Sequence, residues 1–289
     1  MRNLLLSIIL GSINFLDAQT IDTIYNDTLM LIHNSDGSMD SFHVTEVDSI
    51  TFLNRNDTVW VSNSPCGNAT SVSYHGHTYE LVDIAGQCWF KENLQTTKYR
   101  NGIDLSEPLK NSNLGQYCWY DDDSVSYAST YGALYNYIAV NDTSGLCPTG
   151  WHVPTKPEWQ ALLDYLNTNG YNYDGSNSGY KICKALADTI TWNYHSGTGN
   201  VGNTDYPSYR NKSGLSLRAG GRGISSGMWN QPTVSWDGLG LQTGWWTASP
   251  SIVGNYYLGL AWSYDYYYNG NGFDDYYSTH YNYVRCIKD

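Results

Sequence analysis

The sequence predicts an α+β protein with short twisted antiparallel strands, two or three helices and long loops, preceded by a small β module. Charged residues make up only 15% of the chain, aromatic residues another 15%, and glycine occurs 28 times. This composition favours short strands and many turns over long helices. One segment with a capping signal and an apolar stripe nevertheless predicts a stable helix in mid-chain.

The first residues have the features of an export signal. Met1-Arg2-Asn3 gives a basic start, and the apolar run Leu4–Leu10 is too short to span a bilayer. We expect a signal peptide over residues 1–18 and an exported protein, secreted, at the cell surface or in the periplasm. No later segment is apolar for long enough to be a transmembrane segment. The net charge of −12 argues against nucleic acid as a partner, because the chain should repel phosphate groups.

Residues 19–53 predict the small β module. Thr28–Ile32 and Asp48–Leu53 are short apolar runs separated by turn residues, which is typical of paired strands. Polar residues and a proline break the pattern over residues 54–65, where we expect a linker. The main domain should then occupy residues 66–289.

The main domain should begin with short strands. The alternation around His75-Gly76 predicts a hairpin tip, and further strands are predicted at Glu80–Ile84, Gln87–Leu94 and Tyr117–Tyr120. Asp121–Asp123 lacks the alternate spacing of a calcium loop, so we expect a solvated loop there. No metal and no cofactor is expected.

Helical patterns follow. The strongest begins after Thr155, which forms a capping box with Glu158 ahead of an apolar stripe of Trp159, Leu162, Leu163 and Leu166. An earlier helix is predicted from four residues at helical spacing, Tyr131, Leu134, Tyr135 and Ile138. A third, short helix is expected at Tyr180–Ala187, and a long exposed loop at residues 193–211.

The C-terminal region contains the main functional signal. Residues 255–283 hold more than a third of the 27 tyrosines and contain no Lys, Arg or Glu. Tyrosine gives a large, stiff contact surface, and Asn, Asp and Ser give adaptable hydrogen bonds, as in the loops of binding proteins. We therefore expect a recognition surface on a rigid scaffold. A tyrosine-rich sheet rim that binds nothing would have the same composition.

Alternation within this segment predicts which side chains face the ligand. Leu258, Leu260 and Trp262 should point inward, and most residues from Tyr264 to Asn282 should be exposed. The expected aromatic anchors are Tyr257, Tyr264, Tyr266, Tyr268, Tyr276 and Tyr277. The expected polar contacts are Asp265, Asn269, Asn271, Asp274, Asp275, His280 and Asn282.

A non-enzymatic ligand-binding protein is thus the first hypothesis, with a protein or glycan on a cell, phage or fibre surface as partner. An enzyme acting on polysaccharide or protein would need two opposed carboxylates, and the sequence pairs none. A passive envelope component is the third option. The oligomeric state stays open.

Ordered motifs make the chain similar to the Fibrobacter succinogenes major paralogous domain family. The resemblance covers residues 66–289 and lies on Gln87–Leu94, Tyr117–Tyr120, Tyr131–Asn136, Cys147–Pro154 with Glu158-Trp159, Lys184–Ala187 with Trp192-Asn193, Trp245–Ser249 and Val284–Asp289. It implies a C-type-lectin-like fold and no settled activity. In retroelement-diversified relatives of that fold, mutation at adenines converts Asn codons to Tyr, Asp, Ser and His codons, which is the palette of residues 255–283. Divergence of paralogues without a retroelement would leave the same palette, so diversification is a hypothesis.

The resemblance also has specific limits. Glu107-Pro108-Leu109 and Gln231-Pro232-Thr233 lack the third ligand of calcium-dependent sugar-binding lectins. Six cysteines in an exported chain indicate disulfides, and without a C-x-x-C pair they do not indicate zinc. In the lectin-like fold the chain ends lie together, which implies a disulfide between Cys147 and Cys286. The pairing of the other four cysteines stays open.

Overall fold

The computed structural model describes residues 29–33, 39–43, 64–108, 113–228, 231–250, 255–261, 273–276 and 280–289. The chain divides into two units, Met1–Asn68 and Ala69–Asp289. In the first unit, β1 (Leu29–His33) pairs antiparallel with β2 (Met39–His43). β1 coincides with the first predicted strand. The signal peptide, the predicted strand Asp48–Leu53 and most of the linker lie outside the described residues.

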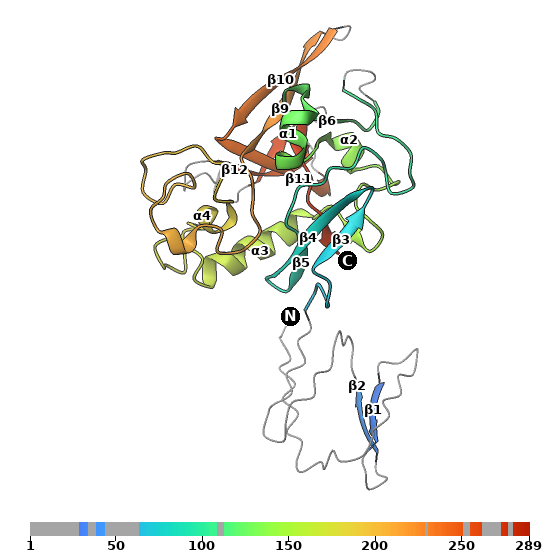
Figure 1. Cartoon of the computed structure of the whole chain (residues 1–289), viewed down its shortest axis with the longest axis vertical. Coiled ribbons are helices and arrows are strands. Elements are labelled where there is room, and N and C mark those ends of the chain that lie inside the picture. Colours follow the sequence, from blue (N-terminus) through green and yellow to red (C-terminus); the bar gives the residue numbers. More distant parts are fainter. Residues whose placement is uncertain are drawn as a thin grey trace. The chain divides into compact units, whose positions relative to one another are not determined.

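The second unit is α+β, as predicted, and contains two sheets (Figure 1). The smaller has the order β3-β4-β5-β15-β8, formed by Ser71–Tyr74, His77–Ile84, Gln87–Phe90, Ile287–Lys288 and Trp151–His152. The hairpin tip at His75-Gly76 is confirmed, and both residues have positive φ angles of 47° and 83°. Because β15 pairs with β5 and β8, the end of the chain lies beside the first strands of this unit.

The larger sheet has eight strands in the order β13-β12-β11-β9-β14-β7-β6, with β10 paired to β9. These strands are β6 Tyr117–Cys118, β7 Leu134–Asn136, β9 Gly220–Met228, β10 Gln231–Leu239, β11 Gln242–Pro250, β12 Asn255–Ala261, β13 Phe273–Tyr276 and β14 Tyr281–Tyr283. β11 runs parallel to β9 and β14, and the other pairings are antiparallel. The tyrosine-rich segment therefore supplies one end of the sheet and one interior strand.

The main helix, α3 (Lys156–Thr168), confirms its capping signal. Thr155 and Glu158 form the predicted capping box, and the predicted apolar stripe is buried. Trp159 lies with its ring centroid 4.5 Å from that of Trp89 in the small sheet and 6.2 Å from that of Trp245 in the large one. The core therefore forms where α3 and the two sheets meet. Among the residues that the structure describes, no helix has the length and apolar character needed to cross a membrane.

The helix predicted over Tyr131–Ile138 is wrong. Tyr131 ends a different helix, α1 (Ser124–Tyr131), and Gly132 follows with a φ of 82°. Leu134–Asn136 is strand β7, paired with β6 and β14, and only Tyr137–Val140 is helical, as α2. The four residues do have helical spacing, but Leu134–Asn136 pairs with a strand almost 150 residues later, and this pairing determines the local structure.

The remaining elements are short. A 3₁₀ turn, η1 (Tyr120–Asp122), precedes α1, and a second, η2 (Pro207–Tyr209), interrupts the predicted loop. α4 (Cys183–Leu186) is shorter than the predicted helix there. The loop at residues 193–211 is only partly exposed: Asn200 and Val201 are buried, and the buried Lys184 donates from Nζ to the Asn203 carbonyl at 2.7 Å.

Candidate functional site

The candidate site is the part of the large sheet that carries the tyrosine-rich segment, and β11 is its frame. Trp245 and Trp246 are both fully buried. Trp245 donates from Nε1 to Asn93 Oδ1 at 2.7 Å, and Trp246 donates from Nε1 to the Tyr135 carbonyl at 2.6 Å. The ring of Tyr137, on α2, meets Trp246 at a centroid distance of 5.4 Å. Because consecutive side chains are packed and hydrogen-bonded, β11 is held on both of its faces.

A buried polar network fixes this frame to the end of the chain. Asn93 Oδ1, which accepts from Trp245, also accepts from Arg285 Nε at 3.0 Å. The guanidinium of the fully buried Arg285 also donates to three backbone carbonyls, those of Phe90 at 3.0 Å, Leu215 at 2.5 Å and Ser216 at 3.1 Å. Burial lowers the pKa of Arg285 to about 9, which leaves it cationic at neutral pH. Sequence reasoning did not predict this network. The one signal that could have indicated it is the position of a charged residue, Arg285, between Val284 and Cys286.

Register places several predicted contact residues close together along the backbone. Tyr257 of β12 pairs with Trp246 of β11 on one side and with Asp274 of β13 on the other. Leu258 pairs with Trp245. The orientation of the β12 and β13 side chains stays a prediction. The expected contacts Tyr264, Asp265, Tyr266, Tyr268, Asn269, Asn271 and Tyr277 lie outside the described residues.

Exposure was predicted wrongly for the residues just before and within β14. His280 is 9% exposed and Asn282 is 1% exposed. The reason is that β14 lies inside the sheet, between β9 and β7. Burial, with a smaller effect of Arg222, lowers the pKa of His280 to about 4, so the ring is neutral at neutral pH. Within the described part of the chain, neither Oδ1 nor Nδ2 of Asn282 has a hydrogen-bond partner.

The two tyrosines of β14 are structural. Tyr281 donates from its hydroxyl to Gln116 Oε1 at 2.7 Å, and Tyr283 donates to the Gly220 carbonyl at 2.8 Å. Both are almost completely buried, which raises the pKa of each phenol. Tyr281 and Tyr283 thus belong to the core, unlike the predicted anchors, which should be exposed.

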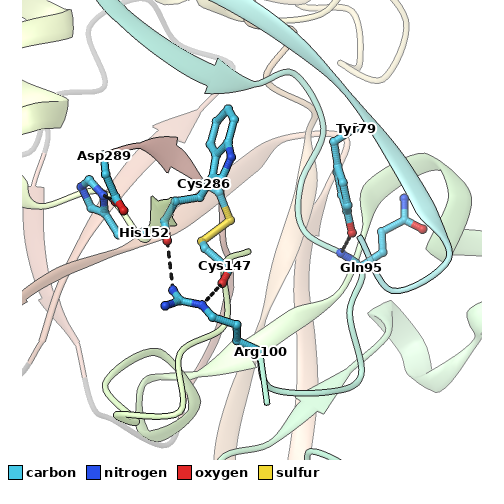
Figure 2. The surroundings of a disulfide bond; sticks show 8 residues. Tyr79, Gln95, Arg100, Cys147, His152, Cys286 and Asp289 are labelled. Carbon is cyan, nitrogen blue, oxygen red and sulfur yellow. Dashed lines mark hydrogen bonds and ion pairs between the residues drawn. A yellow bond between two sulfur atoms is a disulfide. The ribbon is translucent and has the colours of Figure 1, made fainter. Parts of the chain in front are cut away.

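As expected, Cys147 and Cys286 form a disulfide, with their Cα atoms 5.8 Å apart (Figure 2). Arg100 holds the first half of the bridge, because its Nε donates to the Cys147 carbonyl at 2.7 Å and its Nη2 to the Trp151 carbonyl at 3.0 Å. Cys66 and Cys88 are also disulfide-bonded, whereas Cys118 and Cys183 are buried and form no disulfide within the described residues.

A histidine with two carboxylate partners holds the last residue. His152 Nδ1 lies 2.6 Å from Asp289 Oδ1, and its Nε2 lies 2.9 Å from Glu158 Oε1. Hydrogen bonding to Glu158 is the main effect that raises the pKa of His152. The same Glu158 closes the capping box of α3, so this contact joins the helix start to the chain end. No group of three His, Cys, Asp or Glu side chains in the described ranges is placed to hold a metal ion.

Residues 82–288 match the family model of the Fibrobacter succinogenes major domain. No curated protein and no solved structure matches the chain. The matched region contains Asn93, Trp245 and Arg285, which meet in one buried network, and Cys147 and Cys286, which form one disulfide. The chain therefore belongs to the Fibrobacter succinogenes major domain family.

Proposed function

We propose that this chain is an exported, non-enzymatic ligand-binding protein with a C-type-lectin-like scaffold. Its tyrosine-rich segment, residues 255–283 within a variable region over residues 245–284, would bind a protein or glycan on a cell, phage or fibre surface. The observation that carries the proposal is the strand register at the end of the large sheet. It aligns Tyr257 of β12 and Asp274 of β13 beside Trp246 of β11, whose side chain is buried and hydrogen-bonded.

The scaffold supports this role. Binding loops need a rigid base, since ordering a flexible surface on binding costs affinity. The Arg285 network and the Cys147–Cys286 disulfide fix the strands on either side of the tyrosine-rich segment. Chain ends that lie together, as β15 and β5 do, are also a property of lectin-like domains.

The experiment compares the full chain with a variant in which the six predicted anchor tyrosines are serine: Tyr257, Tyr264, Tyr266, Tyr268, Tyr276 and Tyr277. Both are labelled and applied to a printed glycan array and to panels of intact bacterial cells. We expect the parent to bind a defined subset of these surfaces and the variant to bind none. Equal binding by the two proteins would contradict the proposal.

Two controls sharpen this test. Replacing the exposed Tyr165 and Tyr194 by serine, at 40% and 68% exposure outside the segment, should leave binding unchanged. Incubating the parent with the polysaccharides that it binds should release no new reducing ends, and their release would contradict the non-enzymatic assignment.

We further propose that a retroelement diversifies the segment. The abundance of Tyr, Asp, Ser and His alongside Asn over residues 255–283 supports this mechanism. The test is the neighbouring DNA, which should encode a reverse transcriptase and an adenine-biased repeat of the sequence for residues 245–289. A genomic neighbourhood without both would contradict diversification but not ligand binding.

A further inference from the structure

The β9–β10 hairpin lies beside α1 (Figure 1), and three aromatic side chains from this region contact one another. Tyr120 of η1 contacts Tyr127 of α1 and Trp236 of β10, and the ring centroids are 5.4 Å apart in both pairs. All three side chains are partly exposed. We call Tyr120, Tyr127 and Trp236 the aromatic cluster.

The cluster is seated on two glycines of β9. A Cβ atom at Gly221 would lie 2.7 Å from the ring of Tyr120, and one at Gly223 would lie 3.1 Å from the ring of Trp236. The missing side chains let both rings approach the strand closely. Tyr120 and Trp236 also pack against the buried core, so the cluster is a fixed part of the fold.

Two exposed carboxylates, Asp121 and Asp122, follow Tyr120 directly in the 3₁₀ turn η1. In the described part of the chain, neither side chain makes an ion pair or a hydrogen bond. Partial burial and the charge of Asp121 raise the pKa of Asp122. A third carboxylate, Asp237, lies 3.3 Å from Arg222 and is thus already paired.

Elsewhere in the molecule, comparable rings are occupied by cations of the chain itself. Lys212 Nζ lies 5.1 Å from the ring centroid of Tyr171 and 4.7 Å from that of Tyr209. The guanidinium of Arg285 lies 6.0 Å from the centroid of Trp245. Over the aromatic cluster, by contrast, no Lys or Arg of the described ranges is found.

We propose that the aromatic cluster, with Asp121 and Asp122, binds an arginine or lysine side chain of a protein partner. A cation over a ring face is attracted by the ring quadrupole, and the two carboxylates compensate its charge. The net charge of −12 favours the approach of such a partner.

This inference does not rest on ligand binding by the tyrosine-rich segment, because every residue in it lies outside residues 245–284. A neutral sugar would also stack on these rings, but it would leave both carboxylates uncompensated. The observations therefore favour a basic protein segment, and preference for a neutral glycan becomes an outcome that overturns the proposal.

The test measures fluorescence anisotropy of a labelled hexa-arginine peptide with the full chain at low salt, with hexa-glutamine as reference. Asp121→Asn with Asp122→Asn should raise Kd about 5-fold or more. Asp83→Asn with Asp104→Asn removes the same charge from two other exposed sites and should change Kd less than about 2-fold.

The ring contribution is tested at Tyr127. Tyr127→Phe keeps the ring and should bind like the parent, whereas Tyr127→Leu keeps only the apolar bulk and should raise Kd about 2- to 5-fold. Equal losses for the two carboxylate pairs would overturn the proposal, because binding would then follow net charge alone. Equal binding by the Phe and Leu variants, hexa-arginine binding no tighter than hexa-glutamine, or binding of neutral oligosaccharide at the cluster would also overturn it.

Discussion

Replacing Arg285 by methionine should destabilise the fold by about 3 to 5 kcal/mol. The substitution removes hydrogen bonds to the Asn93 side chain and to three carbonyls. Each buried acceptor that loses its donor costs about 1 to 3 kcal/mol, and relief from burying a cation offsets part of the sum. Methionine fills much of the same volume, so a cavity adds little.

The assay is urea unfolding followed by tryptophan fluorescence with the disulfides intact. Arg285→Lys keeps the charge but reaches fewer acceptors, so its loss should be intermediate. The control is Arg210→Met, which removes a partly exposed arginine with a carbonyl contact at 2.8 Å and should cost about 1 kcal/mol or less. A loss below about 1 kcal/mol for Arg285→Met, or one equal to the control, would refute the assigned role of the network.

Three further predictions concern stability. Removing the disulfide by Cys147→Ala with Cys286→Ala opens a loop with a sequence separation of 139 and should cost about 5 kcal/mol in urea unfolding. A loss no larger than that of Cys183→Ala, at a buried cysteine outside the disulfides, would contradict this. His280 has a folded pKa of about 4, below its ordinary 6.5, so the unfolded state binds more protons between these values. The free energy of unfolding should therefore fall as pH drops from 6.5 to 4, and His280→Gln should abolish up to about 3 kcal/mol of that fall, measured by urea unfolding at several pH values. If the variant shows the same pH dependence as the parent, the buried neutral ring is contradicted. Gly221→Ala should lower stability by about 2 kcal/mol or more, since its φ is 68° and the new Cβ would lie 2.4 Å from the Asp237 carbonyl oxygen. Gly76→Ala, with positive φ but open space, should cost less, and equal melting temperatures would show that the contact at Gly221 does not matter.

Sequence reasoning correctly predicted the elements that depend on only a few neighbouring residues. The capping box joins Thr155 and Glu158 three positions apart, and the hairpin tip at His75-Gly76 needs only its own turn. The disulfide was predicted through family resemblance rather than local chemistry. The capping box and the hairpin tip are confirmed because each depends on bonds between residues a few positions apart.

Long-range contacts determine what sequence reasoning missed. Arg285 meets Asn93 across 192 positions, and Trp245 meets Asn93 across 152. Leu134–Asn136 became a strand because β14 pairs with it, and the same pairing buries Asn282. A pattern within a window of ten residues carries no information on which distant strand will lie beside it.

The most direct test of the recognition surface compares binding with stability in single Tyr→Ala variants. The measurements are melting temperature and retention on the surface that the parent binds in the array experiment. Among the predicted anchors, listed above, a few should each cost about 2 kcal/mol or more of affinity with almost unchanged melting temperature. Tyr281→Ala and Tyr283→Ala, at buried positions, should instead lower the melting temperature sharply. If most anchor variants lose stability as these two do, with no selective loss of binding, the tyrosine-rich segment is structural and the account is contradicted.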